Sequence, residues 1–193
     1  DQSVIEDFTY QLRDRGVDLR FGAAVDKIER GANGCSVHLK GGRTVRCDMV
    51  LFAAGRLGAT ADLNLAVCGL ETDHRGRVTV DPTTFQTSAP HIYAAGDVIG
   101  FPSLASTSME QGRIAACHAF DAKGMKPPEY FPYGIYSVPE ISTVGMTEAE
   151  VVERKIPYEV GIARFRETSR GHIMGLDSGL LKLIFSQKTQ RLL

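Results

Sequence analysis

A carboxylate that directly follows a glycine is the group of this chain best placed to do chemistry. Gly96 and Asp97 end a short apolar run, residues 91–95, which predicts a buried strand. In open α/β sheets, ligands bind just outside the carboxyl ends of the strands. A carboxylate at that position only accepts hydrogen bonds, which suits sugar or sugar-alcohol hydroxyls, and a glycine beside it leaves space for a ligand. A purely structural role, in which Asp97 stabilises its own turn, is the alternative.

The segment after Asp97 adds a second binding feature. Residues 100–107 lead into a helix predicted over residues 103–122, and its first turn is almost wholly made of small residues. Small side chains let an electron-rich or anionic group approach the N–H groups of a helix N-terminus, where the helix dipole is positive. The residues of this turn are Ser103, Leu104, Ala105 and Ser106. Simple capping, by Ser103 or by Thr107 with Glu110, is compatible with binding and stays open.

Composition excludes several classes of function. The 193 residues carry 22 Lys and Arg against 23 Asp and Glu, so charge does not favour a nucleic-acid or membrane-surface partner. The longest apolar run, residues 49–54, is far shorter than the roughly 20 residues of a membrane span. The four cysteines form no CxxC pair, which favours reduced thiols in a cytoplasmic protein rather than a zinc site. The five histidines form no cluster, so we predict neither a metal site nor catalytic residues within this chain.

The elements that would position these residues follow an α/β pattern. Apolar residues at 5, 8 and 12 predict a helix ended by Gly16, and alternation over residues 17–21 predicts a strand. Strands are also predicted at residues 24–30, 35–40 and 44–47, with Gly41 and Gly42 as a hairpin turn. The apolar run of residues 49–54, which ends at Gly55, predicts a strand of a covered parallel sheet.

The last third of the chain has a different character. Three prolines within residues 123–132 predict a linker and a domain boundary. Beyond it we predict strands near residues 140–144, 158–163 and 180–185, and a helix opened by a capping box of Thr147 and Glu150. Because the chain starts without Met, directly before a helix, and ends in what looks like a strand cut short, we interpret it as a fragment of a longer protein.

Three motifs together resemble the pyridine nucleotide-disulfide oxidoreductase family of class I flavoproteins. The sequence YAAGD at residues 93–97 resembles the second FAD-binding motif of that family, and FAAGR at residues 52–56 resembles the strand-end motif before it. YSVPEISTVG at residues 136–145 resembles the start of the family's dimerisation domain. The motifs occur in the family's order and span essentially the whole chain. The fold class implied is α/β, with parts of two doubly wound dinucleotide-binding domains followed by the start of an α+β dimerisation domain.

The resemblance also implies domains and ligands. Residues 1–56 would form the C-terminal part of an NAD(P)-binding domain, residues 57–126 the second segment of an FAD-binding domain, and residues 127–193 a truncated dimerisation domain. Asp97 would accept a hydrogen bond from the ribityl chain of FAD. Backbone groups of residues 103–106 would face the flavin ring, and Gly55 would lie near the nicotinamide nucleotide, NAD(P)(H).

Within the family, the motifs are most similar to those of enzymes that transfer hydride between NADPH and NAD+ through FAD. Lipoamide dehydrogenases usually carry a histidine where this chain has Ser106. A disulfide reductase similar to dihydrolipoamide dehydrogenase remains the alternative, because a redox CxxxxC pair would precede Asp1. The chain alone is expected to be inactive, or to act only as a non-catalytic dimerisation module, and the longer protein is expected to be a homodimer.

Overall fold

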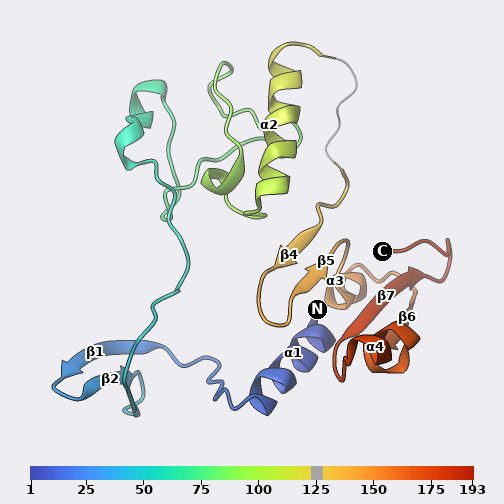
Figure 1. Cartoon of the computed structure of the whole chain (residues 1–193). Helices are drawn as coiled ribbons and strands as arrows, with labels where there is room; N and C mark the ends of the chain where they lie inside the picture. Colours follow the sequence, from blue (N-terminus) through green and yellow to red (C-terminus); the bar gives the residue numbers. More distant parts are fainter. Residues whose placement is uncertain (123–127) are drawn as a thin grey trace. The chain divides into compact units, whose positions relative to one another are not determined.

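A computed structural model describes residues 1–122 and 128–193 of the chain. Two compact units are present: Gln2–Gly55 forms one, and Asp1 together with Arg56–Leu193 forms the other. Figure 1 shows the elements of each unit in the order of the sequence. The first residues of the predicted linker, 123–127, lie outside the described residues.

The smaller unit begins with the predicted helix. Helix α1 covers Gln2–Asp14, and Gly16 ends it with a φ of 84°. The Gly16 amide donates to the carbonyl of Arg13 at 2.9 Å, and the amide of Val17 donates to that of Leu12 at 3.0 Å. These two bonds satisfy carbonyls that the helix end would otherwise leave open.

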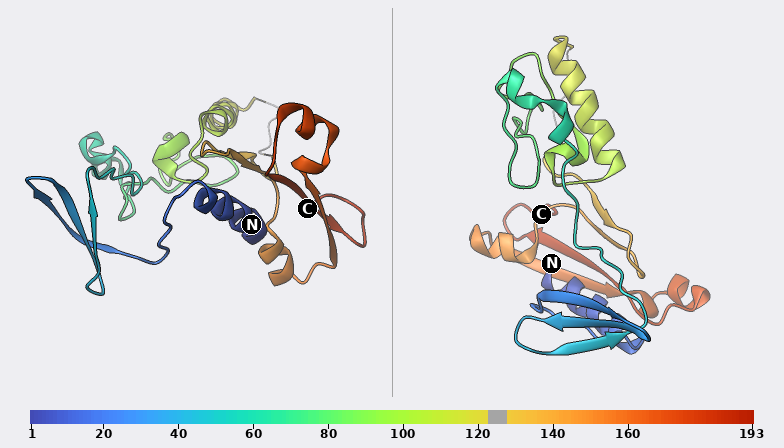
Figure 2. Two further views of the ribbon diagram at one scale, coloured as in Figure 1. Left: turned by 60° about the horizontal axis from the view of Figure 1, so that its bottom comes forward. Right: turned by 90° about the vertical axis from the view of Figure 1, so that its left-hand side faces the viewer.

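The rest of the smaller unit is an antiparallel sheet of three strands in the order β1-β2-β3 (Figure 2). Its strands are β1 (Val25–Gly31), β2 (Gly34–Leu39) and β3 (Thr44–Cys47). Gly41 and Gly42 form the turn between β2 and β3 with φ values of 102° and 87°. The predicted hairpin is therefore confirmed, because only glycine adopts two successive positive φ angles at little cost.

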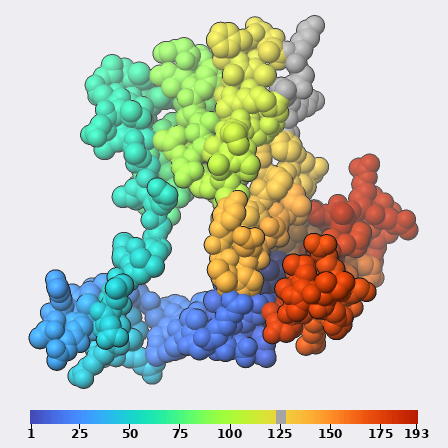
Figure 3. Space-filling model, in the orientation of Figure 1, coloured from blue at the N-terminus to red at the C-terminus, as the bar shows by residue number. Residues whose placement is uncertain are grey.

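Three predicted strands do not form. Residues 17–21, 49–54 and 91–95 are not β-strands in the structure. Met49, Leu51 and Phe52 are 84%, 88% and 82% exposed, and Figure 3 shows this part of the chain as a single thread of atoms. A strand needs hydrogen-bonding neighbours on its edges. Among the described residues, no strand lies beside residues 17–21 or 49–54. The strands predicted for these two segments from the apolar pattern alone are therefore wrong.

The larger unit begins with loops packed on one long helix. Two short 3-10 helices come first, η1 (Ala61–Leu63) and η2 (Leu65–Cys68), and the loops follow them. A third, η3 (Gly96–Ile99), comes before the long helix α2 (Ala105–Ala119). Buried Phe85, Ile114 and Ala115 form the core, against which side chains of the loops and of the segment before β4 pack. Residues 91–95 pair only locally, through one bridge between Tyr93 and Gln86.

The C-terminal part of the larger unit matches the sequence prediction closely. Its strands form two antiparallel pairs, β4 (Tyr133–Ile135) with β5 (Ile141–Thr143) and β6 (Tyr158–Arg164) with β7 (Leu180–Ser186). Helix α3 (Glu148–Glu153) opens with the predicted capping box of Thr147 and Glu150. Two further short elements, η4 (Phe165–Glu167) and α4 (Ser169–Met174), lie between β6 and β7.

The fold class is thus confirmed only as a mixture of helices and strands. All strand pairs named in the described residues are antiparallel. A doubly wound parallel sheet is not formed within this chain, because the apolar runs that would build it have no partner strands among the described residues.

Candidate functional site

Gly96 begins a tight turn that is fixed to helix α2. Its φ of 83° lies in the left-handed region, and its amide donates to Oε1 of Gln111 at 2.7 Å. A Cβ at this position would lie 3.1 Å from Oγ of Ser108. The glycine is therefore required by its backbone angle and by the closeness of α2. Its missing Cβ would face α2, and the role of Gly96 in giving a ligand room stays a prediction.

Gln111 is a positioning residue that the sequence analysis missed. Its side chain is 2% exposed and belongs to the inward face of α2 with Thr107, Ile114 and Ala115. A buried amide without a partner would cost about 1–3 kcal/mol, so its hydrogen bond to Gly96 holds the turn against the helix. The sequence did hold a signal for this role, because Gln111 is a polar residue at a position of the helical repeat that is usually apolar.

The Asp97 carboxylate makes no hydrogen bond or ion pair with the described parts of the chain, residues 1–122 and 128–193. Its side chain is exposed, and only its backbone carbonyl is engaged, by the amide of Gly100 at 3.1 Å. Asp97 therefore does not stabilise its own turn with its side chain. That structural alternative, left open by the sequence, is wrong.

Two other aspartates of the same unit show what the structural role looks like. Oδ1 of Asp73 accepts from the amides of Arg75 and Arg77 at 2.8 and 2.9 Å. Oδ1 of Asp81 accepts from the amides of Thr83 and Thr84 at 2.8 and 2.9 Å. Such bonds favour the charged form. They lower the pKa of the Asp73 carboxyl, chiefly through the Arg77 amide, and that of Asp81, chiefly through the Thr83 amide.

The N-terminus of α2 is open as well. Leu104 is the N-cap residue, and no side chain caps the helix. The Ser103 hydroxyl instead donates to the carbonyl of Gly100 at 2.9 Å. Thr107 is buried inside the helix, and Glu110 pairs with Arg113. Both capping alternatives are therefore wrong.

The other two helices of the larger unit differ from α2. Thr147 caps α3 by accepting from the amide of Glu150, and Thr168 caps α4 by accepting from the amide of Gly171 at 3.0 Å. Among the α-helices described in this unit, α2 is the longest and is the one that no side chain caps at its N-terminus. The first amides of α2 carry the positive end of the helix dipole.

The structure brings six of the seven predicted binding residues into one continuous corner. Gly96 and Asp97 lie in η3, and the remaining four form the segment that enters α2: Ser103, Leu104, Ala105 and Ser106. Gly96 is tied to α2 by its hydrogen bond to Gln111 and lies close to Ser108, and Asp97 follows it directly in the chain. Gly55 belongs to the other unit, where it is exposed with a φ of 104°.

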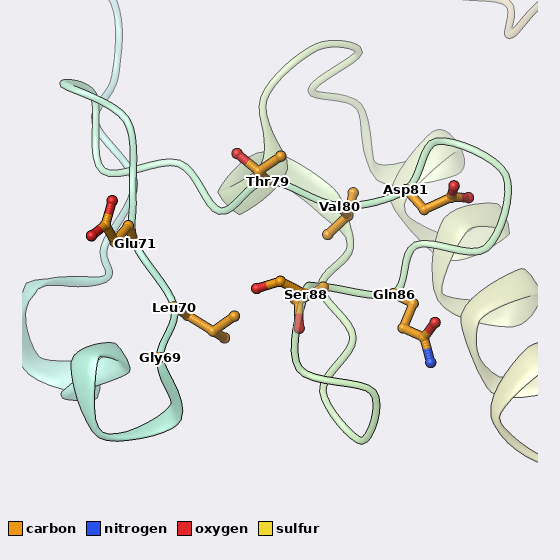
Figure 4. A pocket seen from close by; sticks show the side chains of 9 residues that line it. Gly69, Leu70, Glu71, Thr79, Val80, Asp81, Gln86 and Ser88 are labelled. Atoms are coloured by element: carbon orange, nitrogen blue, oxygen red, sulfur yellow. The ribbon is translucent and has the colours of Figure 1, made fainter.

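A groove of about 540 Å³ lies elsewhere in the larger unit. Figure 4 shows its lining, which includes Leu70, Val80 and Ser88. None of the predicted binding residues contributes to it. The carboxylate of Asp81 at its edge is already engaged by its own turn, and Glu71 is the other acidic residue of the lining.

A charged cluster in the C-terminal part is satisfied internally. Nζ of Lys182, whose side chain is 6% exposed, lies 2.8 Å from Oδ1 of Asp1 and 2.5 Å from Oε2 of Glu148. The Tyr158 hydroxyl donates to Oε1 of Glu148 at 2.9 Å. These bonds lower the pKa of Glu148, with Lys182 as the largest cause, and Glu148 raises the pKa of Tyr158. The cluster stabilises the local fold rather than offering free groups to a ligand.

The described residues contain neither a metal-binding cluster nor a membrane-spanning helix. Within residues 1–122 and 128–193, no three His, Cys, Asp or Glu side chains gather as metal ligands would. No helix in the same residues has the length and hydropathy needed to cross a bilayer.

Comparison with known protein families establishes which family this chain belongs to. Residues 1–112 match the family model described as pyridine nucleotide-disulphide oxidoreductase, and residues 131–193 match the model of the dimerisation domain of the same family. The chain belongs to the pyridine nucleotide-disulphide oxidoreductase family. The resemblance inferred from three motifs is thereby confirmed, and a dimerisation domain is present.

Two curated relatives of this chain carry the same name. The soluble pyridine nucleotide transhydrogenase of Mycobacterium tuberculosis is 49% identical over 193 residues, and that of Colwellia psychrerythraea is 45% identical over 194 residues. In both cases the whole chain is matched, and it spans 41% of the length of the relative.

Two solved structures are similar to this chain over all or nearly all of its length. One is the HOCl-induced flavoprotein disulfide reductase RclA from Escherichia coli, with a TM-score of 0.87 and 31% identity. The match covers 100% of the present chain and 44% of the RclA chain. The other is LpdA from Mycobacterium tuberculosis, with a TM-score of 0.86 and 27% identity. The match covers 96% of the present chain and 40% of the LpdA chain.

Proposed function

We propose that this protein, in its whole form, transfers hydride between NADPH and NAD+ through bound FAD. The observation that supports this most directly is the exposed Asp97 carboxylate, which no described side chain or amide engages, next to an uncapped helix N-terminus. The names of relatives 45–49% identical to this chain agree with the proposal. Asp73 and Asp81 show the alternative arrangement, in which amides of the same turn engage the carboxylate.

The residues of the corner fit the parts of FAD. Asp97 would accept a hydrogen bond from a ribityl hydroxyl, since an ionised carboxylate is purely an acceptor. The free amides at the start of α2 would face the electron-rich edge of the flavin ring, and their dipole would favour the reduced, more negative form. Exposed Ser103, Ala105 and Ser106 are small enough to allow that approach. Bound FAD would supply the hydride-accepting and hydride-donating chemistry that the proposed reaction needs.

The role of the chain is therefore to bind and orient. Gln111 holds the Gly96 amide, so the direction in which Asp97 leaves the turn is fixed before a ligand arrives. Such preorganisation reduces the entropy cost of binding. We further propose that Gly55, with no atom within 4 Å of a Cβ built on it, lets the nicotinamide nucleotide approach the backbone closely.

Domain organisation and assembly complete the proposal. Residues 1–56 would contribute to an NAD(P)-binding domain, residues 57–126 to an FAD-binding domain and residues 127–193 to the dimerisation domain, in a cytoplasmic homodimer. The two nucleotide domains would be doubly wound in the whole protein. Large apolar side chains of the last segment support self-association, because Tyr136, Val138 and Ile173 are 83%, 73% and 86% exposed. The 193 residues alone are expected to show no turnover of nicotinamide nucleotides.

Replacing the carboxylate tests the proposal. In the whole protein, Asp97→Ala should weaken FAD binding about 10- to 100-fold, the cost of losing a charge-assisted hydrogen bond. Binding is measured by titrating apoprotein with FAD and following flavin fluorescence. Asp62→Ala is the matched control, since Asp62 is also an exposed aspartate of the same unit. An unchanged FAD affinity in Asp97→Ala would refute the assignment.

A disulfide reductase is the second candidate, because RclA, similar to the whole chain, is described as a flavoprotein disulfide reductase. The two activities can be compared directly in the purified whole protein. Reduction of an NAD+ analogue by NADPH, without any disulfide present, supports the transhydrogenase. Turnover of NAD(P)H only when a disulfide such as lipoamide is added supports the reductase instead.

A further inference from the structure

Two cysteines far apart in the sequence meet across the hairpin of the smaller unit. Cys35 lies near the start of β2 and Cys47 ends β3, twelve positions later. They are direct partners in the antiparallel register. The thiol of Cys47 is aimed at the other strand, with its Sγ 3.8 Å from the carbonyl oxygen of Cys35.

We propose that Cys35 and Cys47 are a redox-sensitive pair that forms a cross-strand disulfide under oxidising conditions. Both residues are free thiols and half-buried, so reagents can reach them. Neither one belongs to the corner around Asp97, and the proposed hydride transfer does not use them. The pair is therefore a modification site separate from the proposed function.

The spacing of the strands permits the bond. Leu39 donates its amide to the carbonyl of Arg43 at 2.8 Å, and hydrogen-bonded pairs recur every second residue. Cys35 and Cys47 therefore form a hydrogen-bonded pair, in which Cα atoms are about 5.5 Å apart, within the range that a disulfide spans. Opposite Cβ atoms in a hydrogen-bonded pair lie near the wide end of the range of about 4.5–5.5 Å, so they must approach by roughly 1–2 Å to be bridged.

The position of the pair makes that adjustment feasible. Cys47 is the last residue of β3, and the pair closes the open end of the hairpin, opposite the Gly41–Gly42 turn. The end of an edge strand can shift more easily than its middle, since fewer bonds hold it. Because some strain remains after the shift, the disulfide should be readily reduced again, as is typical of regulatory rather than structural bridges.

The chemical step is thiol–disulfide exchange with an oxidised low-molecular-weight thiol such as glutathione disulfide. The thiolate of Cys47 attacks one sulfur of the reagent, its S–S bond breaks, and one reduced glutathione leaves. The thiolate of Cys35 then attacks the sulfur of Cys47 and releases the second glutathione. The protein loses two protons and two electrons, and one glutathione disulfide becomes two thiols.

Mass spectrometry of the whole chain tests the inference. After incubation with glutathione disulfide, we expect a product about 2 Da lighter, through loss of two hydrogens, whose peptide map links Cys35 to Cys47. Dithiothreitol should restore the original mass. Cys35→Ser and Cys47→Ser should each lose the link and carry one glutathione on the remaining partner. Cys68→Ser, which removes an exposed cysteine outside the hairpin, should keep the link.

The double variant Cys68→Ser/Cys117→Ser keeps the test valid if the single hairpin variants fail to fold. It leaves the pair untouched, so it should form the same link as the unmodified chain. The inference is overturned if Cys35 and Cys47 of that variant both remain open to alkylation, or if each carries its own glutathione. A link from either residue to Cys68 or Cys117 in the unmodified chain would overturn it as well.

Discussion

Two segments of this chain have nearly the same sequence and different structures. Residues 52–56 read FAAGR and residues 93–97 read YAAGD, so each is an apolar run that ends in a glycine and a charged residue. Gly55 and Gly96 both have positive φ, at 104° and 83°. Phe52 is 82% exposed in the first segment, whereas Tyr93 of the second packs against the core of the larger unit.

The two segments differ in the atoms that surround their glycines. No atom lies within 4 Å of a Cβ built on Gly55, but one built on Gly96 would meet Ser108 of α2. The amide of Gly96 also has a buried partner, Gln111. The same local pattern is therefore held in place where a helix from the same unit packs on it. It stays open where its sheet partners are absent from the described residues.

The largest expected effect comes from removing the partner of Gly96. Gln111→Leu leaves the buried Gly96 amide without an acceptor and should lower the free energy of unfolding of the larger unit by about 2–3 kcal/mol. Urea denaturation followed by circular dichroism measures the change. Gln187→Leu, at an exposed glutamine, is the control and should change little. A loss below about 0.5 kcal/mol in Gln111→Leu would mean that the turn is not held by this bond.

The two glycines themselves offer a matched pair of substitutions. Gly96→Ala meets both an unfavourable φ and the hydroxyl of Ser108, so it should destabilise by about 1–3 kcal/mol. Gly55→Ala has only the φ cost in an open segment and should lose under about 1 kcal/mol. Denaturant melts of both variants give the comparison. Adding Ser108→Ala to Gly96→Ala should recover part of the loss, and no recovery would assign the whole cost to φ.

The smallest effect is expected in the open segment. Phe52→Ala should change the free energy of unfolding of this chain by less than about 0.5 kcal/mol, because the ring is already in water. The same denaturant melts measure it, with Phe85→Ala, at a ring 3% exposed, as the destabilising control. A loss above about 1 kcal/mol at Phe52 would show that the segment is packed in solution.

Local chemistry made part of the fold predictable. The hairpin turn at Gly41 and Gly42, the end of α1 at Gly16 and the capping box of Thr147 depend on residues a few positions apart. Their geometry is therefore specified by neighbours in the sequence. The strands expected at residues 17–21, 49–54 and 91–95 failed because pairing depends on distant segments, which an apolar pattern does not reveal.

The candidate binding corner around Asp97 was also predictable only in part. From the residue types, Asp97 and the small residues entering α2 could be chosen as candidates, and the family motifs could be recognised. Whether the Asp97 side chain stabilises its own turn depended on the position of every nearby amide, which only the folded chain shows. Gln111 and the meeting of Cys35 with Cys47 were likewise hidden, since helix packing and strand register bring together residues that the sequence keeps 12 to 15 positions apart.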